Sequence, residues 1–328
     1  MHEIINAHFV AYAEAFHDVI GANPRFYTVV ETNAHEGPVY FKDEEALYFT
    51  TVPTATNIPL PGLQVSINRI PLDGKEYPLP TSAITTVQAV SNMANGMTQD
   101  REGRLLICEQ GTKATAARIS RMERKTHEID TVVDNWHGLR FNSPNDIVVK
   151  SDGSVWFTDP SYGALQGFKD APMVGDYVYR YDPATRQIAV VADSFNKPNG
   201  LAFSPDEKIL YINDSAAIQG PGSYVVNLPH HIRAFDVADG THLVNDRLFC
   251  VVTPGIPDGL KVDAAGRVYS SSASGVQVFD LRGNLLGEIL APGVANFTFG
   301  GVDNTTIYMM ADKVIWAAEI KAAGAIRP

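Results

Sequence analysis

The feature that most constrains this chain is an internal repeat. Six segments share one order: a polar residue (Gly in the last segment), a short apolar strand, a polar turn and a second apolar strand. They begin at Glu36, Asn95, Asn145, Asn199, Asp258 and Gly300. Starts about 40–60 residues apart leave too much chain for one hairpin and suit a four-stranded antiparallel sheet. We therefore predict an all-β six-bladed β-propeller, with a β-sandwich or two tandem β domains as the alternative.

The turn residues agree with this architecture. Asp152 and Gly153 lie where a hairpin must reverse, and Asp residues occupy the matching turns at positions 100, 206 and 263. β-Branched and aromatic residues follow the turn at positions 155–157, as strands prefer. The 328-residue chain contains no Pro- or Ser-rich linker, so residues 25–328 are predicted to form a single propeller domain.

The first 24 residues have a different pattern. Apolar residues recur there at helical spacing, which predicts an amphipathic helix that caps the propeller. Those residues are Ile5, Phe9, Tyr12, Phe16 and Val19. Asn23 and Pro24 would end the helix. A disordered leader with some helical character is the alternative.

Composition narrows the classes of partner. The formal net charge is −11, from 26 basic and 37 acidic residues, which argues against a nucleic-acid partner. The sequence has no run of 18 apolar residues and no signal-peptide pattern, so we expect no membrane contact and a cytoplasmic location, with a processed secreted form as the alternative. Cys108 and Cys250 are expected to be buried free thiols rather than one long-range disulfide. The protein is expected to be a monomer or a small homo-oligomer.

The polar residues that open the repeats point to a site on the propeller axis. The innermost strand of each blade starts at the mouth of the central channel, so these side chains should converge there. They are Glu36, Asn95, Asn145, Asn199 and Asp258, each followed by Gly or Asp. An all-oxygen set selects a hard cation, so we expect Ca²⁺, with Mg²⁺, Mn²⁺ or Zn²⁺ as alternatives. The other interpretation is that these residues only cap strands and bind water.

Patterns for other chemistries are missing from the sequence. It has no G-x-S-x-G elbow, no H-E-x-x-H, no P-loop and no G-x-G-x-x-G. His35 precedes Glu36 on the same predicted strand, so its side chain should point the other way and serve packing. Residues 296–298 and 304–306 match the N-glycosylation sequon, which is a weak signal.

Several motifs together resemble the gluconolactonase/regucalcin (SMP-30) family of six-bladed propellers, and fungal lactonohydrolases in particular. These motifs are Glu36-Gly37-Pro38-Val39, Ser143-Pro144-Asn145-Asp146, Phe157-Thr158-Asp159-Pro160, Pro198-Asn199-Gly200, Pro257-Asp258-Gly259 and Val294-Ala295-Asn296-Phe297. The resemblance implies that Glu36, Asn145, Asn199 and Asp258 hold a catalytic metal and that Asn95 faces the same channel. Many relatives carry Glu-His-Gly where this chain has Glu109-Gln110-Gly111, which leaves the substrate preference open.

These observations predict a Ca²⁺-type lactonase that hydrolyses small hydroxylated lactones, similar to gluconolactone or pantoyl lactone. Asp258 is the expected general base, with direct nucleophilic attack as a variant. Asn95 and Tyr162 are expected to bind substrate. A phosphotriesterase on the same scaffold is the alternative enzyme, and a metal-stabilised propeller that serves only as a binding platform is the alternative outside catalysis.

Overall fold

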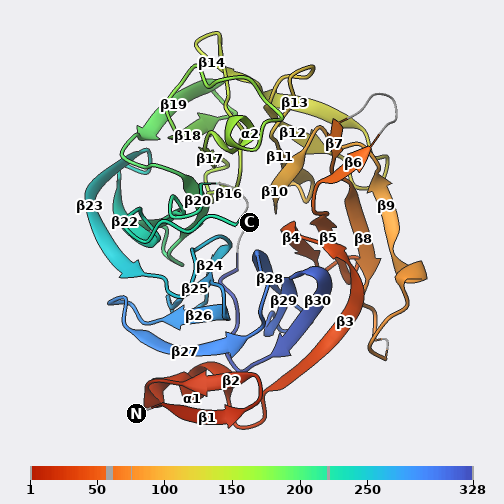
Figure 1. The fold of residues 1–328 in the computed structure, drawn as a ribbon, viewed down its shortest axis with the longest axis vertical. Coiled ribbons are helices and arrows are strands. Elements are labelled where there is room, and N and C mark those ends of the chain that lie inside the picture. Colours follow the sequence, from red (N-terminus) through yellow and green to blue (C-terminus); the bar gives the residue numbers. More distant parts are fainter. Residues whose placement is uncertain (1, 57–61, 75, 220–221, 327–328) are drawn as a thin grey trace.

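The computed structural model describes residues 2–56, 62–74, 76–219 and 222–326. Within those residues, five four-stranded antiparallel sheets and one six-stranded antiparallel sheet surround one central axis (Figure 1), which confirms the predicted six-bladed propeller. Blade 1 contains β4 (Glu36–Phe41), β5 (Ala46–Thr50), β8 (Ile67–Pro71) and β9 (Thr85–Gln88). Blade 2 contains β10 (Ala94–Gln99), β11 (Leu105–Glu109), β12 (Arg118–Met122) and β13 (Ile129–Val133).

The other four blades follow in chain order. Blade 3 contains β16 (Ile147–Val149), β17 (Val155–Asp159), β18 (Tyr177–Asp182) and β19 (Gln187–Ala192). Blade 4 contains β20 (Pro198–Phe203), β21 (Ile209–Asp214), β22 (His231–Ala238) and β23 (His242–Val251). Blade 5 contains β24 (Leu260–Val262), β25 (Val268–Ser271), β26 (Gly275–Phe279) and β27 (Leu285–Leu290). Blade 6 contains β28 (Asn296–Gly300), β29 (Thr306–Met310), β30 (Asp312–Glu319) and β3 (Arg25–Ala34).

Short elements decorate this ring. Two hairpins lie outside the blades: β6 (Thr54–Thr56) with β7 (Gly62–Gln64), and β14 (Asn135–Trp136) with β15 (Leu139–Arg140). Two 3-10 turns span Glu14–Phe16 and Thr81–Ala83, and two short helices are α1 (His17–Ile20) and α2 (Tyr162–Leu165). No helix among the described residues is long and apolar enough to cross a membrane.

The ring closes by joining the two ends of the chain. The long strand β3 pairs antiparallel with β30, with Arg25 opposite Glu319 and Thr28 opposite Trp316. Blade 6 therefore takes its outermost strand from the start of the propeller sequence and its other three strands from the end. Since the chain passes directly from β3 into β4, the same segment also leads into the first blade.

The N-terminal segment is helical only in its second half. The helix is present, but residues 3–11 form the strands β1 (Glu3–Asn6) and β2 (Phe9–Ala11), which extend blade 5 beyond β27. Phe9 lies opposite Ile289 on β27, and Phe9, Phe16 and Val19 are all buried in one cluster with that residue. Pairing with the free edge of β27 satisfies the backbone and buries Phe9 at once, so it overrides the helical spacing.

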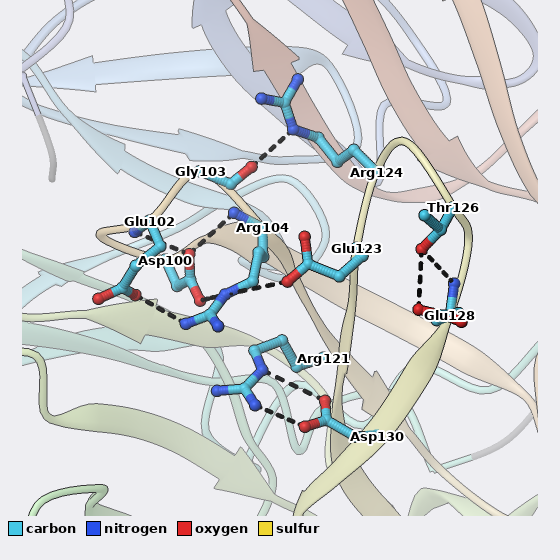
Figure 2. Close-up of polar contacts among 10 residues, drawn as sticks. All are labelled: Asp100, Glu102, Gly103, Arg104, Arg121, Glu123, Arg124, Thr126, Glu128 and Asp130. Carbon is cyan, nitrogen blue, oxygen red and sulfur yellow. Dashed lines mark hydrogen bonds and ion pairs between the residues drawn. The ribbon is translucent and has the colours of Figure 1, made fainter.

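The predicted Asp turns are present. In blade 2 the Asp100 carboxylate accepts hydrogen bonds from the backbone N–H groups of Glu102 (3.0 Å) and Arg104 (2.8 Å) and from Arg104 Nε (2.7 Å), as Figure 2 shows. Asp263 in blade 5 makes the same three contacts with the residues two and four positions later. These carboxylates replace the backbone partners that the reversing chain lacks.

The core lies between neighbouring blades. Trp156 of blade 3 and Phe203 of blade 4 are fully buried and pack edge to face, with ring centroids 5.4 Å apart. Arg124, which follows β12, reaches from blade 2 to blade 1, where it pairs with Asp43 (2.7 Å) and Glu44 and lies over the Phe41 ring. Cys108 and Cys250 are buried free thiols, as predicted.

Candidate metal centre and active site

The polar residues that open the repeats all lie at the starts of inner strands. Glu36 begins β4, Asn95 and Asn199 are the second residues of β10 and β20, and Asn145 and Asp258 stand two residues before β16 and β24. Glu36, Asn145 and Asn199 are each less than 7% exposed. Because every inner strand starts at the same end of the channel, the fold brings these five side chains to one end of the axis.

Backbone contacts between blades fix the positions of these residues. A methyl group added at Gly200 would lie 2.1 Å from the carbonyl oxygen of Asp258, and one at Gly96 would lie 2.4 Å from that of Asn145. A methyl group added at Gly37 would lie 2.4 Å from the carbonyl oxygen of Asn95. The glycine after one repeat residue is therefore needed for the close approach of the next blade, which explains the pairing of polar residue and glycine in the sequence.

Hydrogen bonds from second strands hold the same carbonyl groups. Thr158 Oγ1 donates to the Asn199 carbonyl oxygen at 2.9 Å, and Asn213 Nδ2 donates to the Asp258 carbonyl oxygen at 2.7 Å. The backbone carbonyl groups of Asn199 and Asp258 are thus anchored by the preceding blade.

Two of the residues that open the repeats are acids whose charges interact. Burial, and then the neighbouring charge of Glu36, raise the pKa of Asp258 well above its usual value. Charge from His35 and a side-chain hydrogen bond from Asn199 act in the opposite direction. Two buried acids in mutual repulsion are unfavourable unless a cation or a proton compensates them.

Unpartnered oxygens supply a test of whether a cation fits here. The side-chain oxygens Oδ1 of Asn95 and Asn145 are buried and have no hydrogen-bond partner. Buried polar oxygens without a donor are rare in native proteins, and an ion is one explanation for them. Two such oxygens beside two repelling carboxylates fit a hard divalent cation. No group of three or more His, Cys, Asp or Glu residues among the described residues could hold a metal ion, so a site here depends on the amide oxygens.

A third acid lies next to this set. Burial raises the pKa of Asp146 to about 6; the charge of Lys261 opposes this and that of Glu36 adds to it. Lys261 Nζ contacts Asn296 Oδ1 at 3.3 Å and lies over the Phe297 ring. A lysine ammonium is therefore built into the channel wall close to the acids.

The sequence analysis missed Asn296. The sixth inner strand begins at this residue rather than at Gly300, four positions later. Asn296 is 2% exposed, and its Nδ2 donates to Glu36 Oε2 at 2.8 Å. Its burial also excludes it as a glycosylation acceptor in the folded protein. The signal was available, since Asn296 opens an apolar strand like the other five residues, although no glycine follows it.

Two buried aspartates position the ligand loops and were also missed. The carboxylate of Asp159, at the end of β17, accepts hydrogen bonds from the backbone N–H groups of Asn142 (2.9 Å) and Ser143 (2.8 Å), which come just before Asn145. The carboxylate of Asp214, at the end of β21, accepts hydrogen bonds from the backbone N–H groups of Asn196 (2.9 Å) and Lys197 (3.0 Å), which come just before Asn199. The sequence signal was an Asp that ends the second strand in both blades.

Tyr162 lies beside the predicted catalytic residue. It is the first residue of α2 and is 8% exposed. Burial raises the pKa of its hydroxyl group, and so does the charge of Asp258, while side-chain hydrogen bonds from Asn199 and Ser215 oppose this. The structure therefore brings Tyr162, Asn199 and Asp258 together.

His35, the residue before Glu36, contacts an acid of blade 6. Its Nδ1 lies 2.7 Å from Asp312 Oδ1. Burial lowers the pKa of His35, but the hydrogen bond to Asp312 and the charges of Glu36 and Asp258 outweigh it and raise the pKa to about 9.

Comparison with known proteins places this geometry in a family. Residues 34–313 match the SMP-30/gluconolactonase/LRE-like region, which covers all six inner strands. The chain belongs to this family.

Several relatives of this SMP-30/gluconolactonase family member are named for lactone hydrolysis. A gluconolactonase of Zymomonas mobilis is 32% identical over 290 residues, which cover 85% of this chain and 77% of that protein. The lactonohydrolase oryL of Aspergillus oryzae is 28% identical over 331 residues, 93% of this chain and 73% of that protein. The solved structure of a gluconolactonase from Xanthomonas campestris has a TM-score of 0.77 and 30% identity, and covers 96% of both chains.

Proposed function

We propose that this protein is a metal-dependent lactonase that hydrolyses small hydroxylated lactones, such as gluconolactone- or pantoyl-lactone-like compounds, to hydroxy acids. One observation carries the proposal: at the starts of the inner strands, the charge of Glu36 acts on Asp258, and the Oδ1 atoms of Asn95 and Asn145 are buried without a hydrogen-bond partner. The names of the relatives support the reaction class.

The residues that would hold the cation are Glu36, Asn145, Asn199 and Asp258, and Ca²⁺ is the ion that the oxygen donors favour. When bound, a divalent cation supplies Lewis-acid polarisation of a carbonyl oxygen. The amide of Asn296 orients the Glu36 carboxylate, and Asp214 and Asp159 hold the loops that present Asn199 and Asn145.

Asp258 serves as the general base. It accepts a proton from the attacking water as the water oxygen bonds to the lactone carbonyl carbon, and the proton is returned to the ring oxygen when the ring C–O bond breaks. Burial and the charge of Glu36 raise the pKa of Asp258, so the ionised form that this role requires depends on the bound cation, with His35 and the hydrogen bond from Asn199 acting in the same direction as the cation. Asn95 and Tyr162 bind the hydroxyl groups of the substrate. The alkoxide that leaves needs less assistance than an amine, so a Ser–His pair is unnecessary.

A pH-stat assay tests this proposal. The purified protein is given a panel of hydroxylated lactones with and without a chelator, and a panel of phosphotriesters in parallel. We expect acid release from the lactones that the chelator abolishes and added Ca²⁺ restores. Activity on the phosphotriesters alone would favour a phosphotriesterase. Inactivity on both panels with metal bound would favour a binding platform.

A further inference from the structure

A large pocket opens beside the predicted site. Its volume is about 790 Å³, which lies within the ~300–1,000 Å³ typical of sites for drug-sized ligands. Its walls come from β7 and the residue after it, from β9 and the segment that leads into β10, from the end of β11 through the start of β12, and from the residues after α2. A small lactone ring needs only part of such a space.

Two residues that line the pocket lie close along the chain to predicted site residues. Met93 lines the pocket and stands two positions before Asn95, a span of at most about 7 Å along the chain. Phe168 lines it from the other side, and it follows α2, whose first residue Tyr162 lies near Asp258. A substituent on a lactone bound near Asn95 and Tyr162 can therefore extend into this pocket.

The pocket offers apolar contacts. Leu63 and Val90 both line it and are 39% and 58% exposed, and Val65 and Met93 line it as buried side chains. Large apolar side chains exposed in one concave surface are typical of ligand contact.

Three charged residues line the pocket; Glu109 and Arg118 pair with each other, and Lys113 is exposed. The Glu109 carboxylate is 1% exposed and accepts hydrogen bonds from Arg118 Nε (2.8 Å) and Nη2 (3.0 Å) and from Ser120 Oγ (2.6 Å). Arg118 Nη1 donates to Thr131 Oγ1 at 2.8 Å. This ion pair is satisfied within the protein, so it does not call for a charged ligand.

We propose that this pocket binds an apolar substituent of the substrate, and that the enzyme prefers lactones whose ring carries an alkyl chain of several carbons. The proposal rests on the proposed lactonase function and extends it. The ring and its hydroxyl groups meet the amide side chains at the channel mouth, and the chain lies along Leu63, Val90 and Phe168. The polar residues that open the repeats gave no indication of this preference, because Leu63 and Val90 lie outside the repeat positions.

A series of δ-lactones with n-alkyl chains of one to seven carbons tests the preference. For the wild type we expect kcat/KM to rise with chain length, by up to about fourfold for each methylene that becomes buried. Leu63→Asp and Val90→Asp should each flatten this slope. Val244→Asp is the matched control, because Val244 is 42% exposed on the outer strand β23 of blade 4, and it should keep the wild-type slope.

A binding measurement separates the pocket from the chemistry. Calorimetric titration with the corresponding alkyl δ-lactams, which resist hydrolysis, should show affinity that rises with chain length in the wild type and in Val244→Asp but not in Leu63→Asp. If lactones are turned over but neither kcat/KM nor lactam affinity depends on chain length, the proposed role of the pocket is wrong. Chain-length-dependent lactam binding without turnover of any lactone would overturn the proposed function and leave the pocket standing.

Discussion

The side-chain amide of Asn296 donates a 2.8 Å hydrogen bond to the carboxylate of Glu36, which lies 260 positions away in the sequence. This bond joins the inner strands of blades 6 and 1, on either side of the closure of the ring. It fixes the orientation of one carboxylate oxygen. Partners of this kind are often worth 10- to 100-fold in metal affinity.

We therefore expect Asn296→Ala to weaken Ca²⁺ binding by about tenfold or more. Calorimetric titration of the metal-free protein measures this directly. Asn284→Ala is the control, because Asn284 makes its side-chain hydrogen bond to Asp280 in an exposed turn of blade 5. Equal affinities in the two variants would show that Asn296 has no part in orienting Glu36.

Glu36→Gln should reduce both activity and stability. Removing one of two charged ligands weakens cation binding, and a cation that binds only the native state stabilises it by mass action. The melting temperature of the variant should therefore depend on added Ca²⁺ at higher concentrations than that of the wild type. Thermal scans over a Ca²⁺ series measure the shift. Wild-type melting together with wild-type turnover would make Glu36 a strand cap.

Asp258→Asn should keep the metal and lose turnover. The amide retains an oxygen ligand but cannot accept the proton of the attacking water, so kcat should fall by about 10²–10⁴-fold. Metal content by elemental analysis and kcat on the same lactone are measured side by side. Turnover close to that of the wild type, with metal bound, would remove Asp258 from the mechanism.

Asp214→Ala should lower both the stability of the protein and its affinity for Ca²⁺. It leaves the backbone N–H groups of Asn196 and Lys197 without their acceptor, at a cost of about 1–3 kcal/mol of unfolding free energy. It should also weaken Ca²⁺ binding, because the loop presents Asn199. Denaturant unfolding and calorimetric titration report the two effects. Asp246→Ala, which removes an ion pair with Arg233 on the outer strands of the same blade, should leave Ca²⁺ affinity unchanged.

His231 should make the protein less stable in acid. Burial lowers its pKa, with Arg233 and His230 adding to this and Asp214 and Asp246 opposing it. The folded state therefore binds this proton less well than the unfolded state, whose histidine titrates near about 6.5. The stability contribution is complete above that pH and is lost as the pH falls through it.

The variant His231→Gln should consequently show a flatter dependence of unfolding free energy on pH between about 5 and 7. Denaturant titrations at several pH values give the slope. The control is the same substitution at His242, the exposed first residue of β23.

The sequence predicted the fold because each blade carries the same local signals. Strand, Asp turn and strand recur with a polar residue and a glycine, and each signal reflects a contact that one blade makes with itself or its neighbour. The exceptions are contacts between distant segments. The strand β2 pairs with β27, and β1 pairs with β2, although no local pattern in residues 3–11 indicates this. The helical spacing of Phe9 and Phe16 arises because both are buried against blade 5.

The site was predictable to a similar degree. Residues at matched repeat positions were identified, but Asn296 is followed by Phe297 and lacks the following Gly or Asp that marked the others. Asp159 and Asp214 act through backbone groups of a preceding loop, a role that only the hydrogen bonds reveal. The pocket beside Met93 is formed by four separate segments, so no short motif describes it.

Because β3 pairs with β30, the propeller can close only after the last blade has been synthesised. The partner of β3 is made nearly 280 residues later, about 15–60 s at common rates of translation, and until then β3 is an unpaired edge on the ribosome. The hydrogen bond that orients Glu36 likewise forms only after Asn296 has been synthesised. Cation binding at the axis would then report a completed ring, and a chain interrupted before blade 6 would have neither a closed propeller nor a complete set of ligand supports.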